Sequence, residues 1–246
     1  MGWTALLDTC VLYPLSTRDL LLRGAERYLY QVRWSASIIE EVRRNLIEDQ
    51  RCTEEQARHL VSQMMEAFPE ANVTENDTLT EAMTNDEADR HVLAAAITAG
   101  ADVIVTDNVR HFPPAACDQY GVDVQTPDEF LSYSLDLAPE VMGDIFLQQV
   151  RDLERPALDA ASALAALEKR LPTLAKRLSS LPRVRAEAPD ARYGLVALSR
   201  DKILAEWSIP NDHQSTKVMR LGPWYGDGEE SHRSCRHLRV RHRVRR

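Results

Sequence analysis

Residues 101–108 read Ala-Asp-Val-Ile-Val-Thr-Asp-Asn, and this stretch decides the fold class of the chain. Val103, Ile104 and Val105 are consecutive β-branched apolar residues, a pattern typical of a parallel-sheet strand that is buried on both faces. Asp107 follows this strand at its carboxyl end. Ligands of open parallel sheets bind outside the carboxyl ends of the strands, so this acid stands where a functional group is expected.

Short apolar strands and helical stretches alternate along residues 1–135. Strands are expected at residues 3–7, 32–36, 102–106 and 122–124, and helices at residues 11–30, 37–47, 53–67 and 88–99. This alternation predicts an α/β protein with a three-layer α/β/α arrangement, in which helices cover both faces of a parallel sheet. Capping boxes at residues 37–40 and 84–87 are predicted to begin two of the helices.

Three further segments are expected after this unit. Residues 136–182 are rich in alanine and leucine at helical spacing and predict a helical extension. Residues 183–230 carry mixed signals and are left unassigned. Residues 231–246 contain seven arginines, three histidines and no acid, which predicts a disordered tail. This tail is either a flexible RNA-binding arm or the product of an aberrant reading frame at the end of the gene.

Composition and charge exclude several classes of protein. The four cysteines form no CxxC pair, so neither a disulfide framework nor a zinc site is indicated. Apolar runs stay below the roughly 18 residues that a membrane span needs, and the N-terminus lacks the basic region of a signal peptide. We therefore expect a cytoplasmic protein without a membrane partner. Its net charge of −8 disfavours general nucleic-acid binding, although bound divalent cations can reverse the local field.

Acidic side chains stand at matching positions of separate elements. Asp8 directly follows the first predicted strand, as Asp107 follows a later one. Asp89 leads the apolar stripe of a helix that should face the sheet, and Asp86 lies three residues earlier as a supporting acid. Glu41 follows the second predicted strand on a helix that begins near it, from which its side chain can point toward the sheet edge.

The four acids Asp8, Glu41, Asp89 and Asp107 predict a metal site. Hard oxygen ligands suit Mg²⁺ or Mn²⁺, and an ion held there could activate water and stabilise the leaving oxygen of a phosphoryl displacement. Each acid also has a structural interpretation. Asp8 can cap the helix that follows it, and Asp107 can form a turn with Asn108. The ordered set, and not any single acid, therefore carries the prediction.

Several segments resemble the motifs of PIN domains. They are residues 6–14 (LLDTCVLYP), 37–46 (SIIEEVRRNL), 85–96 (NDEADRHVLAAA), 101–108 (ADVIVTDN) and 122–131 (VDVQTPDEFL). The resemblance covers about the first 135 residues. It implies Mg²⁺-dependent endoribonuclease activity on a three-layer fold, and the nearest likeness is to VapC-type toxins of bacterial type II toxin–antitoxin pairs. It also implies a tRNA or rRNA substrate, a cognate antitoxin partner and a homodimer.

The same resemblance assigns roles to single residues. It makes Asp8 and Asp89 the direct metal ligands, and Glu41 and Asp107 would complete the cluster. The hydroxyls of Thr9 and Thr106 would orient these ligands. Arg90, Arg110 and His111 flank the expected site, where they either contact RNA phosphates or act as ordinary surface charges.

Two departures from the PIN pattern leave questions open. Cys10 stands where many members carry asparagine or serine. In many members the fourth acid or an asparagine comes one residue later, so either Asp107 or Asn108 faces the metal.

Other functions fit the sequence less well. A haloacid-dehalogenase-like phosphatase needs a second acid two residues after Asp8, where Cys10 stands, and a receiver domain needs a lysine that the sheet segment lacks. Neither a P-loop nor a GxGxxG segment occurs. The remaining alternative is a degenerate PIN module that serves as a non-catalytic RNA- or protein-binding scaffold.

Overall fold

The computed structural model describes residues 2–153 and 158–187 of the chain. Five strands of these residues form one parallel sheet with the order β3-β2-β1-β4-β5. They are β1 (Thr4–Leu7), β2 (Gln31–Ser35), β3 (Asn72–Val73), β4 (Val103–Val105) and β5 (Asp123–Gln125). The sheet thus places β1 and β4 side by side, although about a hundred residues separate them in the sequence.

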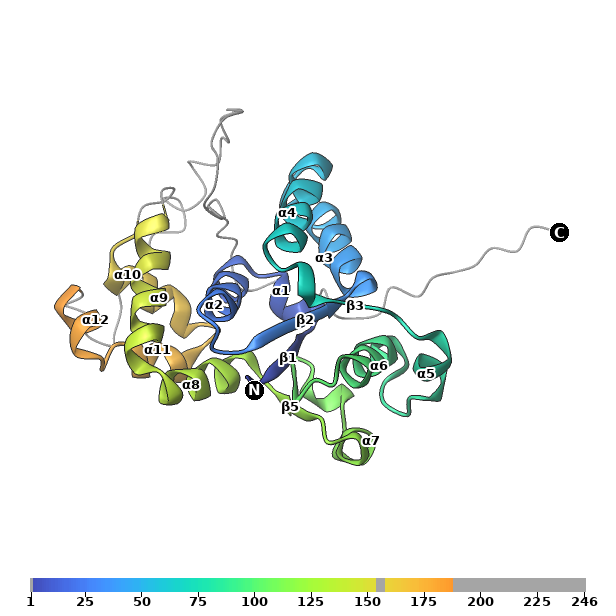
Figure 1. Ribbon diagram of the computed structural model, residues 1–246. Helices are drawn as coiled ribbons and strands as arrows, with labels where there is room; N and C mark the ends of the chain where they lie inside the picture. Colours follow the sequence, from blue (N-terminus) through green and yellow to red (C-terminus); the bar gives the residue numbers. More distant parts are fainter. Residues whose placement is uncertain (1, 154–157, 188–246) are drawn as a thin grey trace.

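Helices cover both faces of this sheet. In the N-terminal part they are α1 (Thr9–Leu12), α2 (Leu15–Glu26), α3 (Ala36–Glu48), α4 (Glu54–Ala67), α5 (Asp77–Ala82), α6 (Arg90–Ala99) and α7 (Pro114–Cys117). In Figure 1, α6 lies below the sheet, whereas α1, α2 and α3 lie above it. The predicted α/β/α fold class is confirmed.

The register of the central strands positions the candidate site. Val103, Ile104 and Val105 have no exposed surface, which confirms a strand that is buried on both faces. Leu7 pairs with Val105, and the amide of Asp8 donates a hydrogen bond of 3.1 Å to the carbonyl of Val105. The residues that follow β1 and β4 therefore emerge next to one another at the carboxyl edge of the sheet.

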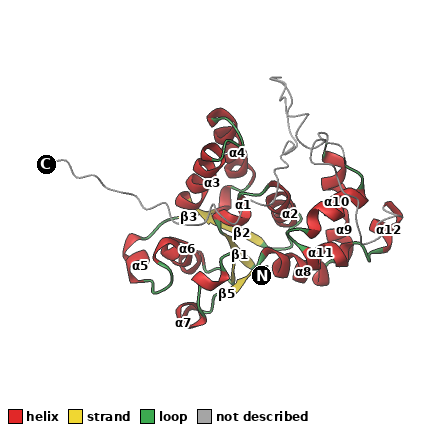
Figure 2. Ribbon diagram, turned by 180° about the vertical axis from the view of Figure 1, so that it is seen from behind, coloured by secondary structure: helices red, strands yellow, loops and turns green. Residues whose placement is uncertain are grey.

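The C-terminal part of the described chain is helical, as the composition of residues 136–182 predicts. It contains α8 (Pro127–Leu137), α9 (Pro139–Asp152), α10 (Ala160–Glu168), α11 (Pro172–Leu178) and α12 (Pro182–Glu187). Figure 2 shows these helices grouped together, with α8 next to the sheet. Their buried residues, such as Phe146 and Leu174, belong to the same hydrophobic cluster as the sheet.

A carboxylate fixes the start of α11. The oxygens of Asp128, in the first turn of α8, accept hydrogen bonds from the amides of Thr173 at 3.0 Å and Leu174 at 2.9 Å. These amides have no partner within their own helix, because the first turn of any helix leaves its N–H groups unpaired. A side chain of α8 thus caps α11 from outside and joins the two helices.

The predicted start of α3 is wrong by two residues. Its N-cap is Ser35 rather than Ser37, because the Ser35 hydroxyl accepts the amide of Ile38 at 3.3 Å. Glu40 consequently does not close a capping box and instead pairs with Arg43. Two serines at neighbouring positions satisfy the same local pattern, and only the end of β2 decides between them.

The capping box predicted at residues 84–87 is also wrong. The Asp86 side chain caps instead, and it accepts a hydrogen bond of 3.1 Å from the amide of Ala88. A short 3₁₀ turn, η2 (Glu87–Asp89), follows, and α6 begins only at Arg90. Asp89 therefore lies in the turn before the helix rather than within its first turn.

Two C-terminal segments of the chain lie mostly or wholly outside the described residues. Of residues 183–230 only the first five are described, within α12, and the arginine-rich stretch 231–246 lies outside the described residues. Within residues 2–153 and 158–187, no helix combines the length and apolarity needed to cross a membrane.

We predict that Asp128→Ala lowers the free energy of unfolding by about 1 kcal/mol, as expected for the loss of a helix cap. Urea unfolding followed by circular dichroism measures the change. Glu66→Ala, which removes an exposed carboxylate of α4, is the control and should leave the midpoint in place. Equal midpoints for Asp128→Ala and the native chain would show that this cap does not stabilise the helical part.

Candidate metal centre

The centre forms where β1 and β4 end. Asp8 follows β1 directly and is only 3% exposed, and Thr106 follows β4 directly and is fully buried. The hydroxyl of Thr106 donates a hydrogen bond of 2.7 Å to Oδ2 of Asp8. Because the strand register sets this contact, the position of Asp8 depends on the sheet itself and not on a surface loop.

Both carboxylate oxygens of Asp8 accept hydrogen bonds. The amide of Thr9 donates to Oδ1 at 2.6 Å, and the thiol of Cys10 donates to Oδ2 at 3.1 Å. Burial raises the pKa of Asp8, the hydrogen bond from Thr106 opposes this rise, and the negative charge of Asp89 adds to it. Asp8 therefore caps α1, as its structural interpretation predicts, and at the same time lies within electrostatic reach of Asp89.

A second group of ligand atoms gathers around Asp89. Its Oδ2 lies 2.5 Å from Nδ1 of His111, which belongs to the 3₁₀ turn η3 (Val109–His111) after β4. The amide of Asp86 donates to the carbonyl of His111 at 3.2 Å and ties the two turns together. Ligand atoms of Asp86, Asp89 and His111 all lie within 4.8 Å of one another, and the described residues contain no other such group.

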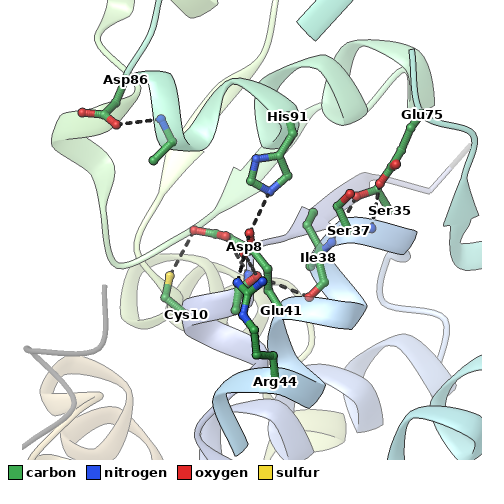
Figure 3. A network of polar contacts seen from close by, with 12 residues as sticks. Asp8, Cys10, Ser35, Ser37, Ile38, Glu41, Arg44, Glu75, Asp86 and His91 are labelled. Atoms are coloured by element: carbon green, nitrogen blue, oxygen red, sulfur yellow. Dashed lines mark hydrogen bonds and ion pairs between the residues drawn. The ribbon is translucent and has the colours of Figure 1, made fainter. Parts of the chain in front are cut away.

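Glu41 faces Asp8 from α3. Its Oε2 accepts a hydrogen bond of 2.9 Å from the hydroxyl of Thr9, the residue after Asp8. Its Oε1 lies 3.8 Å from Nε2 of His91 and 3.9 Å from the guanidinium of Arg44. Figure 3 shows Glu41 beside Asp8 and below the His91 ring.

Asp107 contacts the helical C-terminal part of the chain. Its carboxylate forms an ion pair with Arg170, which lies in the turn between α10 and α11. Its amide donates to the thiol of Cys10 at 3.2 Å. The amide of Asn108 donates to the Thr106 hydroxyl at 3.0 Å, and Asn108 is half-buried at the start of η3.

Of the four predicted ligands, only Asp89 belongs to the group of ligand atoms within 4.8 Å of one another in the described residues, and Asp8, Glu41 and Asp107 lie outside that group. Asp8 and Glu41 share Thr9, Asp89 lies with Asp86, and Asp107 pairs with a cation. Figure 3 shows Asp86 standing apart from Asp8 and capping its own turn.

Arginine and histidine side chains flank the acids of the centre, and some of their contacts were not predicted from the sequence. Arg90 is half-buried and Arg110 is exposed, so Arg110 remains open to a ligand. His111 contacts Asp89, and His91 approaches Glu41. The sequence carries a signal for His91, because it directly follows two candidate residues, Asp89 and Arg90. Arg170 had none, because it lies outside the segments that carry the resemblance.

The donor set fits a divalent cation. Carboxylate oxygens are ligands that Mg²⁺ and Mn²⁺ prefer. Burial and, to a smaller extent, the charge of Asp89 raise the pKa of Asp8, and a cation beside these two carboxylates would compensate their charge.

Comparisons with known proteins match two parts of the chain. The PIN domain family matches residues 4–110, and the VapC50 C-terminal domain family matches residues 127–180. The chain is 40% identical over 100 residues to "Putative ribonuclease VapC50" of Mycobacterium tuberculosis (strain ATCC 25618 / H37Rv). This match covers 41% of the chain and 59% of that relative, so it spans less than two thirds of the relative's length. No solved structure matches the chain.

The raised pKa of Asp8 predicts a specific pH dependence of stability. Between the ordinary aspartate pKa of 3.8 and the raised value, the folded chain binds more protons than the unfolded chain, so its stability falls as the pH rises. We predict that Asp8→Asn removes this part of the fall. Free energies of unfolding at pH 4 and pH 8, measured in a chelating buffer, test it.

Asp118→Asn, which changes an exposed aspartate, serves as the control and should keep the native pH dependence. If Asp8→Asn kept it as well, burial would not be raising the pKa of Asp8.

Proposed function

We propose that the chain is a metal-dependent endoribonuclease, because residues 4–110 match the PIN domain family and residues 127–180 match the VapC50 C-terminal domain family. It would hydrolyse RNA phosphodiester bonds with Mg²⁺ or Mn²⁺ as cofactor. The observation that carries the proposal is the buried Asp8 within electrostatic reach of Asp89. Acids at such positions are costly unless a cation compensates their charge.

Asp8 and Asp89 are the proposed direct ligands, with Glu41 and Asp107 as the further members of the cluster. A bound divalent ion would supply an activated water and stabilise the leaving oxygen of the phosphodiester. The chain's own hydrogen bonds prepare the ligands for this. Thr106 and Cys10 fix Oδ2 of Asp8, and Thr9 connects Asp8 with Glu41.

Neighbouring residues support the ligands and the substrate in this proposal. His111 orients the Asp89 carboxylate through its Nδ1 contact, and Asp86 holds the turn that carries Asp89. Asn108 supports the segment after β4 through its hydrogen bond to Thr106. Arg90 begins α6 and Arg110 lies in η3, and both would contact RNA phosphates.

The biological role that fits is that of a toxin in a type II toxin–antitoxin pair. The likeness to VapC proteins supports a structured RNA substrate such as tRNA or rRNA, a cognate antitoxin that blocks the site, and a homodimer. A cytoplasmic location belongs to the same proposal.

RNA cleavage tests the proposed function directly. With total RNA and Mg²⁺, the native chain should produce discrete cut ends, and Asp89→Asn should lower the rate more than about 100-fold, because removal of a ligand exceeds the usual effect of its supporting groups. Asp144→Asn, which changes a surface acid of α9 that pairs with Arg183, should cleave at the native rate. Equal rates for native chain and Asp89→Asn would contradict the proposal.

Metal-dependent stabilisation separates the nuclease from the non-catalytic scaffold. We expect Mn²⁺ at 100 times its dissociation constant to stabilise the native chain by about 2.7 kcal/mol, because an ion that binds only the folded state shifts the equilibrium by mass action. The melting temperature should rise accordingly, and that of Asp89→Asn should not. A scaffold that has lost its metal site would show the same melting temperature with and without Mn²⁺ in both chains.

A further inference from the structure

An arginine of the helical part reaches the candidate metal centre. Arg170 pairs through Nη2 with Oδ2 of Asp107, and the same nitrogen lies 3.4 Å from the carbonyl oxygen of Cys10. The side chains of Arg170 and Asp107 are 25% and 37% exposed, so water screens this ion pair only in part. This ion pair joins two separately matched parts of the chain. Arg170 lies in the region that matches the VapC50 C-terminal domain family, and Asp107 lies in the region that matches the PIN domain family.

The turn that carries Arg170 is held firmly. Leu171, the next residue, has no exposed surface, and the amide of Arg170 donates to the carbonyl of Leu167 at 3.1 Å. Two residues further on, Asp128 caps the first turn of α11. The turn that carries Arg170 is therefore fixed by packing and capping, and it holds the guanidinium beside Asp107.

Asp107 in turn is coupled to the buried end of the centre. The thiol of Cys10 accepts the Asp107 amide and donates to the Asp8 carboxylate. Arg170 contacts two of the three residues of this path, Asp107 through its carboxylate and Cys10 through its carbonyl. Its charge consequently acts at the place where the proposed cluster needs its fourth carboxylate.

We propose that Arg170 is an internal cation of the centre, which competes with the divalent ion for Asp107 and so lets the helical C-terminal region set the metal affinity. This inference rests on the proposed metal-dependent function. An Asp107 oxygen that accepts a guanidinium N–H is a weaker ligand, and a positive charge beside the cluster repels a second cation. Both effects lower the affinity of the centre for a divalent ion.

The competition is reciprocal. A ligand that weakens the binding of another by a given factor is itself weakened by that factor, and such factors typically lie between about 5 and 150. Metal binding should therefore loosen the hold of Arg170 on Asp107. The position of Arg170 in the turn between α10 and α11 would therefore depend on whether an ion is bound at the candidate metal centre.

Isothermal titration of Mn²⁺ into the full chain tests the proposal without an activity readout. Arg170→Gln should bind Mn²⁺ on the order of tenfold more tightly than the native chain. The gain should be smaller in the double variant Arg170→Gln/Asp107→Asn, because the part that depends on the freed carboxylate is lost. Arg177→Gln removes an ion pair with Asp136 in the same helical region and should bind Mn²⁺ like the native chain.

Unchanged or weaker Mn²⁺ binding by Arg170→Gln would overturn the proposal, and weaker binding would make Arg170 a residue that positions Asp107 for the ion. Circular dichroism checks that the variant folds. If it does not fold, Arg170→Met, which keeps an apolar stem of similar length without the charge, should bind Mn²⁺ more tightly than the native chain, and equal affinity would contradict the proposal. Failure of the underlying function looks different, because the native chain and Asp89→Asn would then bind Mn²⁺ equally poorly.

Discussion

The pairing of β1 with β4 is the constraint on which the candidate centre depends. It joins the first strand to one about a hundred residues later and sets Leu7 opposite Val105. The next residue of each strand, Asp8 and Thr106, then meets across the sheet edge with a hydrogen bond. Burial of the strands on both faces keeps this contact out of water, which explains why a single carboxylate there carries a raised pKa.

Features that depend on local pattern could be predicted from the sequence. The three apolar residues of β4, the alternation of strands and helices and the acids after β1 and β4 together led to the correct fold class. The boundaries of α3 and α6 were harder, because several serines, threonines and aspartates fit the same cap pattern. Ser35 and Asp86 cap because the preceding segments deliver them to the first helical amides, which is a tertiary effect.

Contacts between residues far apart in the sequence could not be predicted from local patterns. Arg170 lies 63 residues from Asp107, and no periodicity links a turn between two late helices to the end of a central strand. The contact of His111 with Asp89 was missed for a related reason, since it depends on how η3 folds back toward η2. Order and spacing therefore identified which acids approach the sheet edge, whereas their partners emerged only from the packing of the helices around it.

The pairing of the short strand β1 with β4 does not tolerate a shift of one residue. Side chains alternate between the two faces of a strand, so a slip of one residue against β4 would exchange the faces of every β1 side chain. Asp8 would then lose its place beside Thr106, and the apolar residues of β1 would meet the wrong helical layer. Insertions or deletions within Thr4–Leu7 should accordingly be far less tolerable to this chain than changes of length between its outer helices.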